Sequence, residues 1–162
     1  SIETGGFERI NINPNGSINF SHSSFNVEGD AEYKFALLKT EVTVSGQQVW
    51  LTLPDNTELS MPDNSAWVFD VEIVGKQQGG PDAAGYRYKG LMTRDAGAST
   101  VKFVENPLEE LLGESLGTWG WEGGVSADPS TGGLRIYAKV SAYTKPGPVN
   151  WLAMVKLTEL NF

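Results

Sequence analysis

The chain has 162 residues and carries 12 lysines and arginines against 20 aspartates and glutamates, a formal net charge of −8. This acidic balance argues against nucleic acid or an anionic membrane surface as the main partner. The absence of cysteine excludes disulfides and thiolate metal sites, and no apolar run approaches the ~20 residues that a membrane-spanning helix needs. The length suits one compact unit. Because the chain begins with Ser1 rather than methionine, we expect it to be part of a longer protein.

The first segment, residues 1–31, is rich in asparagine, serine and glycine and differs from the rest of the chain. A strong turn signal lies at Asn13-Pro14-Asn15-Gly16. Apolar residues alternate with polar ones on both sides of it, at Ile10, Ile12, Ile18 and Phe20. The pattern predicts a small hairpin, which is marginal in water alone. We therefore expect residues 1–31 to form a stem or interface segment that packs on the main domain or on other copies of the chain.

Residues 32–162 have the pattern of a head domain made of strands. Apolar and polar side chains alternate in short runs that are separated by turn-forming residues. The expected strands are Tyr33–Val44, Val49–Leu53, Thr57–Met61, Trp67–Val74, Tyr86–Met92, Val101–Val104, Trp121–Ala127, Leu134–Tyr143 and Val149–Leu160. About nine strands at this spacing indicate an all-β fold, an antiparallel β-sandwich of jelly-roll-like type, although a barrel shares the pattern.

One stretch interrupts the strand pattern. Asn106 stands where a helix N-cap would, Pro107 takes the first helical position, and Gly113 follows the end. The sequence predicts a short helix here, with a strand as the alternative, because two turns of helix are marginal without packing.

The last strand is apolar on both faces. Trp151, Ala153 and Val155 alternate with Leu152 and Met154. A strand of this kind is covered on both sides, so a subunit interface is expected on its second face.

Few residues suit catalysis or metal binding. His22 is the only histidine, in a polar segment, and there is no thiol. The carboxylate pairs Asp70/Glu72 and Glu109/Glu110 are compatible with a glycoside hydrolase, which needs only two such groups. We interpret them instead as the solvated face of a strand and the first turn of the predicted helix. No cofactor and no metal are therefore expected.

Aromatic residues are the better indication of a binding surface. Three tryptophans in phase with inward-facing residues are expected in the core, namely Trp67, Trp121 and Trp151. Trp50 is out of phase with its apolar neighbours, Trp119 lies in a glycine-rich stretch, and Tyr137 and Tyr143 lie on the outward face of their strand. Exposed aromatics of this kind anchor a protein interface, stack on a sugar ring, or lie half covered at an edge.

Several different short motifs of turn and core residues are spread along residues 29–160. They are Gly29-Asp30-Ala31, Pro62-Asp63-Asn64-Ser65-Ala66-Trp67, Ala84-Gly85-Tyr86, Ala96-Gly97, Trp121 with Ser126-Ala127-Asp128, Gly132-Gly133-Leu134 and Asn150–Val155. In these motifs the chain resembles the C-terminal receptor-binding domain of bacteriophage tail fibre and tailspike proteins. It departs from that pattern at Pro107–Gly113 and at Trp119.

The resemblance implies a homotrimeric, non-enzymatic head at the tip of a virion tail fibre. Its expected function is to recognise bacterial surface polysaccharide, either capsule or lipopolysaccharide, and to contribute to trimerisation. Two alternatives stay open: a polysaccharide-degrading tailspike enzyme that uses carboxylates, and a purely structural trimerisation domain. The residues expected to contact the ligand are Trp50, Asp82, Trp119 and Tyr143, with the loop Lys76–Ala83 as the favoured segment.

Overall fold

The computed structural model describes residues 2–4, 7–22, 31–141 and 147–161. Within these ranges the chain forms thirteen strands and two short 3-10 turns, η1 (Ala98–Thr100) and η2 (Leu116–Thr118). All strand pairings are antiparallel. The predicted all-β, antiparallel sandwich is confirmed. A helix of the length and apolar character required to cross a membrane does not occur in the described ranges.

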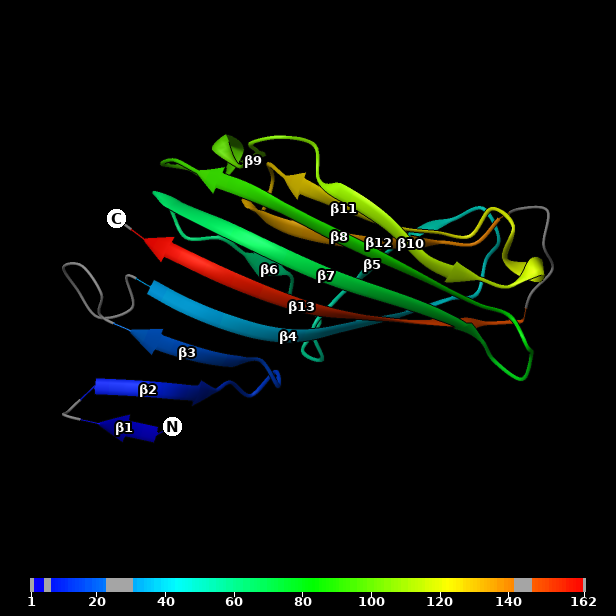
Figure 1. The fold of residues 1–162 in the computed structure, drawn as a ribbon, viewed down its shortest axis with the longest axis horizontal. Helices are drawn as coiled ribbons and strands as arrows, with labels where there is room; N and C mark the ends of the chain where they lie inside the picture. The colour runs from blue at the N-terminus through cyan, green and yellow to red at the C-terminus, as the bar shows by residue number, and fades with distance from the viewer. Residues whose placement is uncertain (1, 5–6, 23–30, 142–146, 162) are drawn as a thin grey trace.

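The larger sheet has nine strands and forms one long layer of the molecule (Figure 1). Its order is β1-β2-β3-β4-β13-β7-β8-β10, and β9 also pairs with β8. The bounds are β1 (Ile2–Thr4), β2 (Phe7–Ile12), β3 (Ile18–His22), β4 (Ala31–Val42), β7 (Ser65–Gln77), β8 (Ala83–Arg94), β9 (Lys102–Phe103), β10 (Leu108–Glu114) and β13 (Val149–Asn161).

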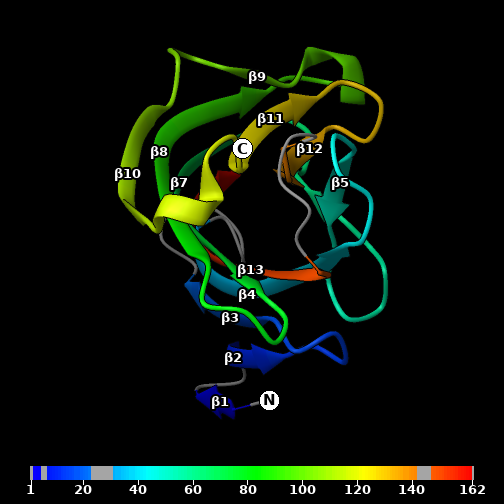
Figure 2. The same cartoon turned by 90° about the vertical axis from the view of Figure 1, so that its right-hand side faces the viewer.

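The smaller sheet faces the central strands of the larger one, as the view along the strands shows (Figure 2). Its order is β11-β12-β5, and β6 pairs with β12. The bounds are β5 (Gln48–Leu51), β6 (Leu59–Ser60), β11 (Glu122–Asp128) and β12 (Gly133–Lys139). The two sheets bury one continuous apolar core between them.

The core follows the alternation that the sequence predicted. On β7 the odd-numbered side chains from Trp67 to Ile73 are buried, and the even-numbered ones point to the opposite face. Trp67, Trp121 and Trp151 are all buried, which confirms their predicted place. Close packing also explains a glycine: a Cβ at Gly75 would lie 2.8 Å from the Trp151 ring.

The predicted helix after Asn106 is wrong, and the strand alternative is correct. Residues Leu108–Glu114 form β10, which pairs with β8. The edge of β8 would otherwise present unpaired backbone groups, and its pairing outweighs the weak local helix preference. Glu109 and Glu110 therefore lie in a strand and not in a helical turn.

The predicted N-terminal hairpin is present as β2 and β3. Ile10 lies opposite Phe20, and Ile12 lies opposite Ile18. β3 then pairs with the first half of β4, so this segment extends the larger sheet. The hairpin thereby gains the third strand that an isolated pair lacks.

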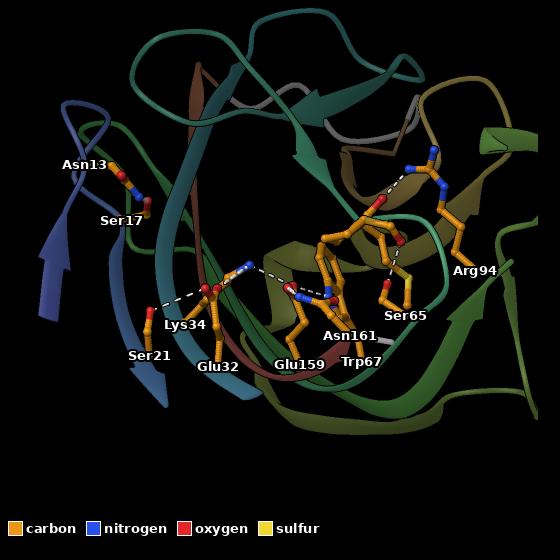
Figure 3. Close-up of polar contacts among 12 residues, drawn as sticks. Asn13, Ser17, Ser21, Glu32, Lys34, Ser65, Trp67, Arg94, Glu159 and Asn161 are labelled. Carbon is orange, nitrogen blue, oxygen red and sulfur yellow. Dashed lines mark hydrogen bonds and ion pairs between the residues drawn. The ribbon is translucent and has the colours of Figure 1, made fainter. Parts of the chain in front are cut away.

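A buried carboxylate links three strands of the larger sheet. Glu159 on β13 is 1% exposed, and its Oε2 accepts hydrogen bonds from Trp67 Nε1 at 2.5 Å and Lys34 Nζ at 2.7 Å. Figure 3 shows the Lys34 and Trp67 side chains reaching it from either side. Asn161 donates to the other oxygen at 2.8 Å. Burial lowers the pKa of Lys34, but the bonds to Glu159 and Glu32 outweigh that effect and raise it.

Replacing this carboxylate tests how much the link stabilises the fold. We expect Glu159→Gln to lower the free energy of unfolding by about 2 to 3 kcal/mol, because Lys34 loses its buried counter-charge while keeping Glu32. Urea unfolding followed by tryptophan fluorescence measures this. The control Glu105→Gln, at an exposed carboxylate, should change it by less than about 0.5 kcal/mol. Equal effects of the two substitutions would show that the buried link contributes nothing.

Candidate functional site

The outer face of the smaller sheet gathers aromatic and charged side chains. On β12, Arg135, Tyr137 and Lys139 point outward, between the buried Leu134, Ile136 and Ala138. Strand neighbours place Trp50 of β5 and Glu122 of β11 on the same face. We call the set Trp50, Glu58, Glu122, Arg135, Tyr137 and Lys139 the small-sheet surface.

Tyr137 leans across β11. Its hydroxyl donates a hydrogen bond to Glu122 Oε1 at 2.7 Å. A Cβ on Gly124, the residue opposite it, would lie 2.3 Å from Tyr137 Cζ, so only glycine leaves room for the ring here. Burial and then the bond to Glu122 raise the pKa of Tyr137 to about 12.

Trp50 of β5 lies next to Tyr137, on the side of β12 away from β11. The two ring centroids are 6.0 Å apart and the rings are nearly perpendicular, at 87°. Trp50 is 36% exposed, so its out-of-phase position in the sequence corresponds to an outward-facing side chain. The Cζ of Arg135 lies 5.0 Å from the centre of the Trp50 ring, a cation–π distance. Trp50 and Tyr137 together form what we call the aromatic corner, on a surface that is otherwise polar.

Arg135 joins two carboxylates beside this corner. Its Nε is 2.9 Å from Glu58 Oε2 and 3.1 Å from Asp128 Oδ2. Both contacts use Nε, and the guanidinium has further N–H donors on its terminal nitrogens. The hydrogen bond to Glu58 is the main cause that raises the pKa of Arg135. Lys139 lies 3.8 Å from Glu122, so both cations of the surface are close to carboxylates.

Asp128 has a structural task at the start of the β11–β12 turn. Its carboxylate accepts hydrogen bonds from the backbone and hydroxyl groups of Ser130 and Thr131, the shortest at 2.6 Å. Burial alone would raise the pKa of Asp128, but the bonds from Thr131 and Ser130 outweigh it and lower the pKa to about 2. Asp128 is therefore ionised at neutral pH and is not a general acid.

A second surface lies at the end of the sandwich where the β7–β8 hairpin and η2 meet (Figure 1). Ser115 Oγ donates to Asp82 Oδ1 at 3.0 Å and accepts from the backbone N–H of Ala83 at 3.1 Å. Ser115 precedes η2, Trp119 follows it, and the Trp119 indole is 71% exposed. The structure thus connects Asp82 to the turn that carries Trp119.

The four residues expected to bind the ligand do not form one cluster in the structure. Asp82 and Trp119 belong to the loop end, Trp50 lies on the small-sheet surface, and Tyr143 lies outside the described residues. Sequence reasoning noted that Tyr137 faces outward but did not select it or its charged neighbours. Alternation on β12 could have identified Arg135 and Tyr137. No pattern could have found Glu58, because it comes from another segment of the chain.

The surface offers the contacts that a polyhydroxylated ligand uses. It combines two aromatic rings with carboxylate acceptors and a guanidinium donor. In the part of the chain that the structure describes, no cluster of three or more acidic or histidine side chains is arranged to hold a metal ion. The aromatic rings and polar groups of the surface suit binding through stacking and hydrogen bonds.

Comparisons with known proteins give a structural similarity at a low score. No protein-family model matches the chain, and no curated protein matches it in sequence. Among solved structures, the chain is similar to the tailspike protein gp49 from the Acinetobacter baumannii bacteriophage Fri1, a capsular polysaccharide depolymerase. The TM-score is 0.44 at 11% sequence identity, over 80% of this chain and 18% of that chain. The chain thus spans about one fifth of the length of that tailspike.

This comparison corrects one expectation. The sequence led us to expect a non-enzymatic chain, whereas the tailspike with the similar fold is a depolymerase. The non-enzymatic interpretation is therefore withdrawn. The comparison gives no residue of this chain a role, so the chemistry of the small-sheet surface has to be argued from its own geometry.

The turn at Asp128 gives a pH-dependent prediction. Because the folded-state pKa is lowered, the ionised carboxylate stabilises the fold above its ordinary pKa of 3.8, and this contribution is lost as the pH falls toward 2. At neutral pH we expect Asp128→Asn to be less stable than the unmodified chain by about 2 kcal/mol. The gap should close between about pH 4 and pH 2.

Chemical unfolding of both proteins across that pH range measures the gap. Taking the difference between them cancels the contribution of the other carboxylates. Asp95→Asn, at an exposed turn, is the control for loss of one charge. A gap that stays constant from pH 7 to pH 2 would contradict the assigned role of the Asp128 carboxylate.

Proposed function

We propose that this chain binds a bacterial surface polysaccharide, capsule or lipopolysaccharide, through the small-sheet surface. The observation that carries the proposal is the aromatic corner of Trp50 and Tyr137, which lies on the outer face of the smaller sheet and is bordered by Glu58, Glu122 and Arg135. The apolar face of a sugar ring fits against an aromatic ring. Its hydroxyls donate to carboxylates and accept from the guanidinium.

The corner is built before a ligand arrives. Tyr137 is held by Glu122 and by the space above Gly124, and Trp50 is held between Tyr137 and Arg135. A fixed binding surface loses little side-chain entropy when it takes up a ligand. This favours a rigid surface that recognises repeating sugar units over one that adapts to many ligands.

Charge points to the class of glycan. The surface carries three carboxylates if Asp128 is included, against the two cations Arg135 and Lys139, and each cation is already close to a carboxylate. The whole chain has a net charge of −8. An acidic sugar would meet repulsion here, whereas a neutral hexose or an amino sugar would not. The proposed ligand is therefore a polysaccharide without acidic groups in the unit that is bound.

The proposal includes the setting that the sequence motifs imply. The chain would be a receptor-binding domain at the tip of a phage tail fibre and would assemble as a homotrimer. Three copies would let weak individual sites act together on a repetitive cell surface, which raises the overall affinity without new contacts. A purely structural trimerisation role is the competing outcome.

Hydrolysis of the bound glycan is a second candidate function. Glu122 bonds the Tyr137 hydroxyl, and Glu58 bonds the arginine that covers Trp50, so the two carboxylates border the same aromatic corner. Glycoside hydrolases place two carboxylates around the scissile bond. Asp128 is not assigned to this pair because its oxygens serve the turn.

Two substitutions separate binding at the aromatic corner from binding at the loop end. We expect Trp50→Ala to weaken glycan binding at least about tenfold, equivalent to ~1.4 kcal/mol. Gly124→Ala should do the same without removing any aromatic ring, because the new Cβ displaces Tyr137 from its bond to Glu122. An array of purified neutral and acidic bacterial polysaccharides is the readout.

Trp119→Ala is the matched control, because it removes an exposed tryptophan from the other surface. Loss of binding in Trp119→Ala, with retention in Trp50→Ala, would move the site to the loop end. Binding to acidic glycans alone would contradict the charge argument. Absence of binding to every polysaccharide on the array would favour the structural role.

The hydrolytic candidate has its own measurement. Incubating the chain with each bound polysaccharide and assaying new reducing ends detects cleavage. We expect Glu58→Gln and Glu122→Gln each to abolish any cleavage seen, with binding retained in at least one of them, since an amide keeps the shape of the carboxyl group but cannot transfer its proton. Cleavage that survives both substitutions would exclude these two carboxylates as the catalytic pair.

A further inference from the structure

The outer face of the larger sheet is apolar over much of its area and is not covered by any described part of the chain. Its side chains come from alternate positions of β4, β13, β7, β8 and β10, which point away from the smaller sheet. Val68 is 56% exposed, Val74 49% and Leu152 43%. We call this the large-sheet face.

The strand register arranges these side chains in two apolar stripes. The first stripe lies toward the β7–β8 hairpin and contains Leu37, Val74, Leu112, Leu152 and Met154. Most of its members border a hollow of about 500 Å³. The second stripe lies toward the opposite end and continues onto the N-terminal hairpin. It contains Ile18, Phe20, Tyr33, Phe35, Val68 and Leu91.

A band of ion pairs lies between the stripes on β13, β7 and β8, while on β4 the stripes meet at the neighbouring outward positions Phe35 and Leu37. Arg87 binds Asp70 through two nitrogens, at 2.6 and 2.9 Å. Glu72 lies 3.8 Å from both Arg87 and Lys156. The bond to Arg87 lowers the pKa of Asp70 and keeps it ionised. These polar groups therefore satisfy one another within the face.

The band is electrically balanced. Its cations are Lys89, Arg87 and Lys156, and its carboxylates are Asp70, Glu72 and Glu110, which lies opposite Arg87 in the strand register. The chain as a whole has a net charge of −8, so two copies repel one another over most of their surface. The ion-pair band is neutral, and the hairpin end of the same face adds Lys39, Glu41 and Lys76, so two copies can meet on this face with little of that cost. A basic or acidic partner would gain nothing from it.

The size of the face suits a stable interface. Four strands of 12 or 13 residues and the 7-residue β10 form the face. At a strand spacing of ~4.8 Å and ~3.3 Å per residue, they give an area of roughly 900 Å². A standard interface takes about 800 Å² from each partner. This area includes the ion-pair band, and exposed apolar stripes on both sides of such a band are typical of a surface that meets a partner.

We propose that the large-sheet face is the surface through which copies of this chain associate. The two stripes bury against those of neighbouring copies, and the ion-pair band lies between them. The inference supplies the surface for the assembly named in the proposed function, and it stands without the glycan site, which lies on the other sheet. The sequence already indicated it, because β13 is apolar on both faces.

Sedimentation equilibrium of the 162-residue chain tests the proposal. We expect a mass of three copies at micromolar concentration. Leu152→Glu should shift the dissociation midpoint at least about 100-fold toward the monomer, because it places a charge among the apolar side chains of the first stripe. Leu37→Glu, in the same stripe on β4, should act in the same way.

Leu116→Glu is the matched control, since it makes the same change at a fully exposed position on η2. Far-ultraviolet circular dichroism verifies that each variant is folded. A monomeric mass for the unmodified chain at a concentration of about 100 micromolar would overturn the proposal. Retention of the full oligomer in both stripe variants would also overturn it.

These experiments test the glycan site and the assembly surface separately. Trp50→Ala should keep the oligomeric mass while losing glycan binding. Leu152→Glu should lose the oligomer while a monovalent measurement of glycan binding stays unchanged. Loss of glycan binding on the array alone in Leu152→Glu reports lost avidity and supports the assembly surface.

Discussion

The pairing of β13 with two neighbours is the constraint on which the rest of the structure depends. This strand is hydrogen-bonded along almost its whole length to β4 on one side and to β7 on the other. Because side chains in a strand alternate with a period of two, a slip of one residue would exchange the buried and exposed sets. Trp151, Val155 and Glu159 on the inner face fix the register, since Glu159 finds Lys34 and Trp67 only in this alignment.

This register determines both faces of the larger sheet. The inner face receives the smaller sheet and closes the core. The outer face receives two apolar stripes and a self-satisfied band of charges. A single strand with apolar side chains on both sides thus stabilises the fold and contributes to the surface that we propose for association. In the proposed assembly, the smaller sheet then faces away from the contact and presents the aromatic corner to a glycan.

The small-sheet surface depends on a glycine, Gly124, as much as on its aromatic side chains. Gly124 leaves the space that Tyr137 occupies, and Tyr137 in turn gives Trp50 a perpendicular neighbour. Arg135 contacts the Trp50 ring and also pairs with two carboxylates from separate segments of the chain. The corner is therefore a tertiary feature that no single strand contains.

Local sequence patterns were enough to predict the fold class, most of the strands, the hairpin that ends at residue 22 and the three core tryptophans. Period-two alternation and turn residues are local signals, and burial of large apolar side chains follows directly from them. The N-cap, proline and glycine pattern near residue 107 predicted a helix that does not form. The local helix preference is weaker than the stabilisation gained by pairing with the edge of β8. The non-enzymatic interpretation, which the family resemblance implied, was also wrong and is corrected by the comparison with a depolymerase.

Tertiary structure alone decided which surface residues come together. Trp50 was selected from its sequence, but Glu58, Glu122 and Arg135 join it only because β5, β11 and β12 are neighbours in one sheet. Asp82 and Trp119 were selected with Trp50 and lie on another surface, because their loops meet at the end of the sandwich. Alternation fixes which way a side chain points. The neighbours it meets are fixed by strand order, which is set by pairings between segments far apart in the chain.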